Sequence, residues 1–193
     1  MRSYCSMCHF PASTCLCAHI SRTPCPLSIV VLQHNNEAGH AKNTVRLLKL
    51  AMPEIRVITG RTPSDFTDIA LEVTSGQSGV IYPTENSTAL EEYEKRGEPT
   101  LLKQLIFIDG SWPQAYGIWQ ANTWLHALPQ FHFNDAPKSE YEIRHVRMKN
   151  SLSTLEAVSY AISTITATDT SPLLKLQLAF QQKWRSPKSH RRN

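Results

Sequence analysis

Short apolar runs alternate with longer polar or amphipathic stretches along this chain. The runs are rich in β-branched side chains and too short for helices, which is typical of buried strands. They predict strands at residues 27–32, 55–58, 79–82, 105–108 and 130–133.

Helical patterns separate most of these runs. They predict helices at residues 38–51, through Glu91, Glu92 and Glu94, from Trp112 to about Leu125, and after Ser153 and Ser171. Residues 60–77 are polar and predict irregular structure. This order indicates an α/β fold with a mainly parallel sheet flanked by helices.

The length of 193 residues suits one domain with a hydrophobic core, and a hydrophobic content of 41% is ordinary for a globular protein. No apolar run approaches the ~20 residues of a membrane span. The first residues also lack the apolar core of a secretory signal. We therefore expect a cytoplasmic protein with an N-terminal appendage at 1–22, a main domain at 23–182 and a tail at 183–193.

The net charge of +4 is concentrated at the C-terminus. Residues 183–193 hold five cations and no acid, so the rest of the chain holds 15 basic and 16 acidic residues, a balance of −1. Such a tail can neutralise phosphates and predicts a nucleic-acid partner; a solvated end that aids solubility is the alternative. The tail cations are Lys183, Arg185, Lys188, Arg191 and Arg192, and a second basic cluster comprises Lys138, Arg144, Arg147 and Lys149.

Four of the five cysteines crowd the first 17 residues with the spacing C-x2-C-x6-C-x-C: Cys5, Cys8, Cys15 and Cys17. In a cytoplasmic chain such spacing predicts a metal site, and four thiolates suit structural zinc in a small knuckle. Reduced thiols without metal and a redox role are the alternatives. His9 and His19 are reserve ligands, and Cys25 lies outside the spacing.

Polar side chains follow three of the predicted strands. If these strands are parallel neighbours, their carboxyl ends form one rim, where ligands usually bind in such folds. The rim would carry His34, Glu37, Tyr82, Asp109, Ser111 and Trp112. Asp109 ends the apolar 105–108 run and could instead cap the helix that Pro113 begins.

Two further motifs have competing interpretations. Ser153 and Glu156 have capping-box spacing, although the exposed N–H groups of that helix start could also bind a ligand carboxylate. The His34-x2-Glu37-x2-His40 pattern lacks the spacing of a zinc protease. A Ser111–His34–Asp109 relay would take both Ser and Asp from one turn, which is awkward geometry.

Several motifs occur together in the order of a known family. They are the paired cysteines, Gln33-His34…Glu37…Asn43-Thr44, Tyr82-Pro83, Asp109-x-Ser111-Trp112, Tyr141-x-Ile143-Arg144 and Ser153-Thr154-x-Glu156-Ala157. The ordered set spans nearly the whole chain and resembles the DTW-domain family, the bacterial tRNA-uridine aminocarboxypropyltransferases. The sequence departs from that pattern at Ser111, where Thr is usual, and at Asn35-Asn36, where a Pro is common.

The resemblance implies a fold similar to the knotted SPOUT-type RNA methyltransferases. It implies transfer of the 3-amino-3-carboxypropyl group of S-adenosylmethionine to N3 of a tRNA uridine, in the variable loop, with release of methylthioadenosine. Catalysis would depend on Asp109 as base, Ser111 as its orienting group and Trp112 as a stacking ring, with core packing as the alternative for Trp112. No metal is needed for this displacement, so zinc would be structural.

The remaining expected contacts fall into two sets. S-adenosylmethionine would contact Tyr82, Pro83, Ile108, Asp109, Gly110, Arg144, Ser153, Thr154 and Glu156. The tRNA would contact His34, Glu37, Trp112, Lys183, Arg185, Arg191 and Arg192.

Three other functions remain open at this point: a SPOUT-like RNA methyltransferase, a non-enzymatic zinc RNA-binding module and, more distantly, a serine hydrolase. No protein partner is evident, and the chain would be a monomer or a homodimer.

Overall fold

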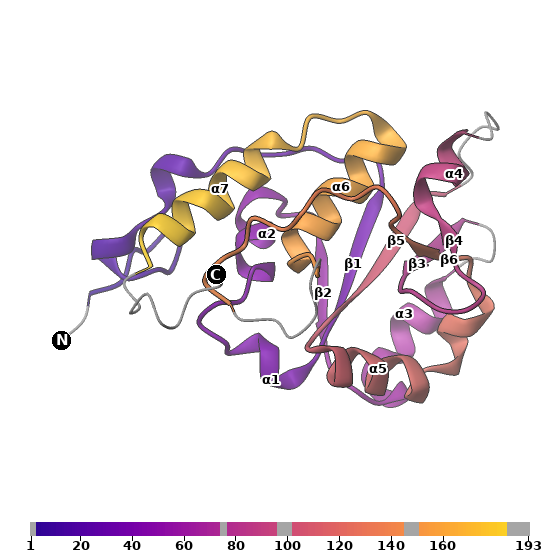
Figure 1. The fold of residues 1–193 in the computed structure, drawn as a ribbon. Helices are drawn as coiled ribbons and strands as arrows, with labels where there is room; N and C mark the ends of the chain where they lie inside the picture. The colour runs from indigo at the N-terminus through magenta and orange to yellow at the C-terminus, as the bar shows by residue number, and fades with distance from the viewer. Residues whose placement is uncertain (1–2, 74–76, 96–101, 145–150, 185–193) are drawn as a thin grey trace.

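The structure, a computed structural model, describes residues 3–73, 77–95, 102–144 and 151–184. Six strands form one sheet in the order β2-β1-β5-β3-β6-β4, and every pairing is parallel (Figure 1). The expected parallel α/β architecture is therefore confirmed; its likeness to a knotted SPOUT-type fold stays a prediction. The strands are β1 Ser28–Gln33, β2 Arg56–Thr59, β3 Ser78–Ile81, β4 Thr88–Ala89, β5 Gln104–Asp109 and β6 Gln130–His132.

Helices cover both faces of the sheet (Figure 1). They are α1 Asn35–Ala38, α2 Val45–Ala51, α3 Thr67–Glu72, α4 Leu90–Lys95, α5 Trp112–Ala121, α6 Thr154–Thr166 and α7 Ser171–Gln182. Alternation along β1 shows which helices share a face, because successive strand side chains point to opposite sides. Ile29 and Val31 pack in a core with α2, α6 and α7, whereas Val30 and Leu32 pack in a second core with α3 and α5.

The predicted helix at 38–51 is confirmed only in its second half, because α2 begins at Val45, whereas α1 ends at Ala38 and the chain between the two is not helical. Asn43 explains the break. Its side-chain amide donates to the carbonyl of Glu37 at 2.8 Å, and its side-chain oxygen accepts from the Val45 N–H at 2.8 Å. A side chain that satisfies the end of one helix and the start of the next favours the interruption.

Two other boundaries also differ from the predictions. Residues 60–77 are not wholly irregular, since a 3-10 helix at Pro63–Phe66 leads into α3 behind a Thr62–Asp65 capping box. Helix α5 ends at Ala121 rather than near residue 125. The buried Asn122 side chain donates there to the Ile118 carbonyl at 2.8 Å and to the Arg61 carbonyl at 3.0 Å.

The N-terminal segment packs against α7 and α2 (Figure 1). Cys8, Phe10 and Leu16 are buried in the same core as α6 and α7. The Phe10 ring meets Phe180 of α7 edge-on, with 5.5 Å between ring centroids. The N-terminal segment therefore contributes to the main core. Within the described residues, no helix is long and apolar enough to cross a membrane.

Candidate functional site

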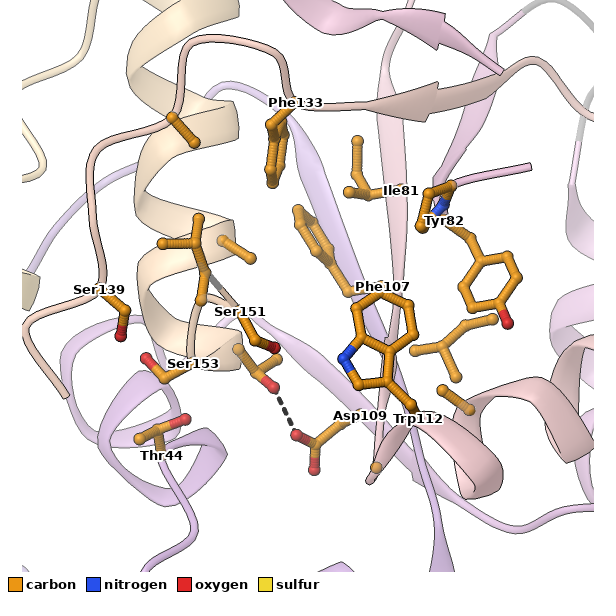
Figure 2. Close-up of a pocket in the computed structure, with 18 of the residues that line it drawn as sticks. Thr44, Ile81, Tyr82, Phe107, Asp109, Trp112, Phe133, Ser139, Ser151 and Ser153 are labelled. Atoms are coloured by element: carbon orange, nitrogen blue, oxygen red, sulfur yellow. Dashed lines mark hydrogen bonds between the residues drawn. The ribbon is translucent and has the colours of Figure 1, made fainter. Parts of the chain in front are cut away.

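A cavity of about 1160 Å³ opens where β5 and β3 end, beside the start of α6 (Figure 2). One wall is apolar and includes Ile81, Phe107 and Phe133. The polar part of the lining includes Asp109, whose side chain shares a face of β5 with Phe107 because the two are two residues apart. This placement agrees with the rule that ligands bind at the carboxyl ends of parallel strands.

The strand order fixes the surroundings of Asp109. Gln33 of β1 lies opposite it in the parallel ladder, and the Gln33 side-chain amide donates to Asp109 Oδ2 at 2.8 Å. The Thr154 hydroxyl, in the first turn of α6, donates to Oδ1 (Figure 2). Burial raises the pKa of the Asp109 carboxyl, and these two hydrogen bonds oppose that rise only in part. Each carboxylate oxygen keeps a further acceptor site, so Asp109 is suited to accept a proton.

The N-cap residue of α5 is Ser111 rather than Asp109, so the capping alternative for Asp109 is wrong. Ser111 is the N-cap residue and forms a capping box with Gln114, whose Oε1 accepts from the Ser111 N–H at 2.7 Å. The Ser111–His34–Asp109 relay is not formed. Asp109 bonds to Gln33 and Thr154, while His34 Nδ1 accepts from the Asn36 N–H at 3.2 Å.

Arg144 and Glu37 form a bidentate ion pair beside the cavity. The guanidinium donates to the two Glu37 carboxylate oxygens at 2.7 and 2.6 Å, and only 4% of Glu37 is exposed. Arg144 lines the cavity and Glu37 lies behind it. The Glu37 hydrogen bonds raise the pKa of Arg144, so its positive charge is fixed at the cavity wall.

Two buried carboxylates hold the segment that closes another side of the cavity. Glu156 accepts from the Ser139 hydroxyl and the Glu140 N–H, each at 2.8 Å, and completes the predicted capping box with Ser153. Glu91 accepts from the N–H groups of Asn134 and Asp135 at 3.2 and 3.1 Å. The segment between these anchors is therefore fixed at both ends.

Aromatic rings flank the cavity mouth at the start of α5. Trp112 is 36% exposed, and its ring lies 6.5 Å from the Tyr82 ring, centroid to centroid (Figure 2). Tyr82 in turn stacks on the buried Trp119 at 5.0 Å. The core-packing alternative for Trp112 is wrong, and its indole is accessible to a ligand in the cavity.

The structure brings together most of the predicted site residues. Ten of them line the cavity: Tyr82, Pro83, Ile108, Asp109, Gly110, Ser111, Trp112, Arg144, Ser153 and Thr154. Three other predicted residues do not line the cavity but hydrogen-bond to residues that do: His34 to Asp109, Glu37 to Arg144 and Glu156 to Ser139. Lys183 donates instead to the Cys15 carbonyl, and Arg185, Arg191 and Arg192 lie outside the described residues, as do Arg147, Lys149 and Lys188.

The sequence-based prediction missed several lining residues. Phe107 and Phe133 form the apolar wall, and Lys42 and Ser139 line the polar part. Phe107 could have been identified, because a residue two positions before Asp109 on a strand faces the same side. Lys42 gave no such signal, since its place depends on the break between α1 and α2.

The four predicted zinc ligands also lie together. The sulfurs of Cys5 and Cys17 are 3.5 Å apart, those of Cys8 and Cys15 are 3.7 Å apart, and all four lie within 4.8 Å of one another. Zn–S bonds of about 2.3 Å in a tetrahedron place the sulfurs ~3.8 Å apart, so the cluster fits zinc. Among the described residues this is the one group suited to a metal, and neither His9 nor His19 belongs to it.

Comparison with known proteins identifies relatives of the chain. The profile of the DTW domain matches residues 2–185. A Mus musculus protein named tRNA-uridine aminocarboxypropyltransferase 2 is 32% identical over 168 residues, which are 84% of this chain and 56% of that protein; its Macaca fascicularis namesake gives the same values. The Drosophila melanogaster protein of that name is 30% identical over 171 residues, 85% of this chain and 67% of that protein. The chain thus spans little more than half the length of the mouse and macaque relatives, and no solved structure matches it.

Proposed function

The chain belongs to the DTW domain family, and from this premise we propose that it transfers the 3-amino-3-carboxypropyl group of S-adenosylmethionine to N3 of a uridine in tRNA. The observation that carries the proposal is the buried Asp109 carboxylate with a raised pKa, placed in a cavity at the strand ends. The names of the relatives support the same reaction.

The cavity suits two ligands rather than one. Its volume of about 1160 Å³ exceeds the range of ~300–1000 Å³ typical of a single small-molecule site. The apolar wall at Phe107 and Phe133 offers adenine a surface to pack against. Arg144, held in place by Glu37, can pair with the carboxylate of the methionine part of the donor. The donor would then lie with its side-chain carbons facing Asp109.

Asp109 takes the proton in the proposed step. Uridine N3 is a weak acid, so its proton must leave before the nitrogen can attack. Asp109 accepts this proton, and N3 forms a bond to the side-chain carbon attached to sulfur. The bond from that carbon to sulfur breaks and its electron pair stays on sulfur, which leaves methylthioadenosine as a neutral thioether.

Trp112 and the two side chains that hydrogen-bond to Asp109 position the uracil and the carboxylate for this step. The Trp112 indole can stack on the uracil at the cavity mouth, as flipped bases are held in other enzymes. Gln33 and Thr154 fix the plane of the Asp109 carboxylate through their hydrogen bonds. The choice between the methyl and the aminocarboxypropyl carbon depends on such positioning.

Zinc has a structural part in this proposal. It would be held by the four cysteines and would stabilise the N-terminal segment, whose Phe10 and Leu16 are buried in the main core. The basic tail would contact tRNA phosphates.

One incubation tests the reaction. Unmodified tRNA transcript and S-adenosylmethionine are supplied together, and both the nucleosides and the small-molecule product are analysed by mass spectrometry. Aminocarboxypropyluridine with methylthioadenosine is the expected result. Methylated nucleoside with adenosylhomocysteine would identify a methyltransferase instead, and RNA binding with neither product would identify a non-enzymatic module.

A further inference from the structure

Helix α5 carries two exposed aromatic side chains on one face. Trp112 and Tyr116 are 36% and 57% exposed, and a spacing of four residues places them on neighbouring turns of the same side. Trp112 begins this face at the cavity mouth, where it is part of the lining. The face therefore continues outward from the site where the target uridine would enter.

Packing of α5 does not require these two rings. The helix contacts the sheet through Ala115, Ile118 and Trp119, all of which are buried in the core shared with α3. A single exposed aromatic side chain is ordinary on a protein surface. Two in register beside an active-site cavity resemble the stacking surfaces on which proteins hold unpaired bases.

A cation lies along the same helix. Arg61, which follows β2, is exposed, and its Nε lies 3.7 Å from the position that a Cβ would take on Gly117. The Arg61 guanidinium thus lies against α5 at Gly117. Arg61 makes no salt bridge with any of the described residues. Its charge is available for a phosphate on the flank of α5 at Gly117, the residue that follows Tyr116.

We propose that Tyr116 stacks on the nucleotide next to the target uridine, with Arg61 contacting a neighbouring phosphate. Trp112 holds the target base and Tyr116 holds its neighbour, so the α5 face requires an unpaired RNA segment. The inference rests on the proposed function, because it places the target uridine at the cavity mouth. It adds a requirement that the RNA around the target be single-stranded.

Equilibrium binding in the absence of donor tests this proposal. The probes are a fluorescent unmodified tRNA transcript, a short oligouridylate and a blunt RNA duplex. Tyr116→Ala should raise Kd for the tRNA and the oligouridylate by about 5- to 150-fold, the range for one lost stacking contact. Tyr116→Phe should bind like the unaltered protein, since it keeps the ring. Arg61→Gln should reduce the salt slope by about 0.7, the value for one phosphate contact to a single strand.

Gln120→Ala is the matched control, because Gln120 is exposed one turn further along α5. It should leave Kd unchanged. A Tyr116→Ala Kd within twofold of the unaltered protein would overturn the proposal, as would equal losses with the duplex or a Tyr116→Phe variant as weak as Tyr116→Ala. An unaltered protein that binds tRNA but transfers nothing would refute the proposed function, while these comparisons of Kd would still decide the role of Tyr116.

Discussion

Asp109→Asn separates the proposed catalytic role of this residue from a structural one. The two side chains have the same shape, and both hydrogen-bond partners can adapt to the amide. Gln33 can turn its own amide so that it accepts from the Asn nitrogen, and the Thr154 hydroxyl can still donate to the Asn oxygen. The substitution therefore removes the proton acceptor while keeping the local packing.

The expected loss of activity follows from the missing base. General base catalysis typically contributes about 10²- to 10⁴-fold, or ~3–5 kcal/mol of the activation barrier. Because burial raises the pKa of Asp109, the unaltered enzyme should lose activity as pH falls through that raised value, where the carboxylate becomes protonated. The residual activity of the Asp109→Asn variant should not show this fall at low pH.

The stability of the protein should not fall with its activity in the Asp109→Asn variant. A carboxyl group whose pKa is raised by folding favours the folded state in its protonated form, so its ionisation lowers the free energy of unfolding above that pKa. Asp109→Asn removes this cost, and its Tm at neutral pH should equal or exceed that of the unaltered protein. Sites that lower stability for the sake of activity commonly behave in this way.

The assay measures transfer to tRNA under single-turnover conditions, donor binding by calorimetry and Tm by circular dichroism. Donor affinity should be retained, since Arg144 and the apolar wall are untouched. Near-full transfer by the variant would refute the assignment of Asp109 as base. A fall of Tm by several degrees would show instead that the carboxylate mainly stabilises the fold.

Three further predictions concern other parts of the chain. Cys5→Ser should lower the amount of bound zinc, measured by atomic emission, and reduce Tm. Cys25→Ser lies outside the cluster and should change neither quantity. Equal amounts of zinc in both variants would exclude the four-cysteine site. Glu37→Gln leaves Arg144 without its charged partner, so the KM for the donor should rise about tenfold. The free energy of unfolding, measured by urea titration, should fall by ~1–3 kcal/mol. An unchanged KM for the donor would show that this ion pair has no part in donor binding. Deleting residues 185–193 removes four cations, which should weaken tRNA binding and flatten its dependence on salt, and an unaltered salt slope would eliminate the tail as a contact.

Local sequence patterns determined much of the fold and part of the site. Apolar runs with β-branched side chains gave the positions of the main strands, because a strand buried on both faces needs apolar residues on both. The cysteine spacing predicted the cluster, since its ligands are close in the chain. Asp109 was identified because the apolar run ends there, and the carboxyl end of a buried strand is where ligands bind.

Tertiary structure decided which distant residues meet. The Glu37–Arg144 pair joins residues 107 positions apart, and Gln33 reaches Asp109 only because β1 lies beside β5 in the sheet. Neither contact follows from local periodicity, which reports the exposure of a residue but not its neighbours. The exposure of Trp112 was likewise undecided until α5 was placed, since a tryptophan at a helix start suits a core and a binding surface equally well.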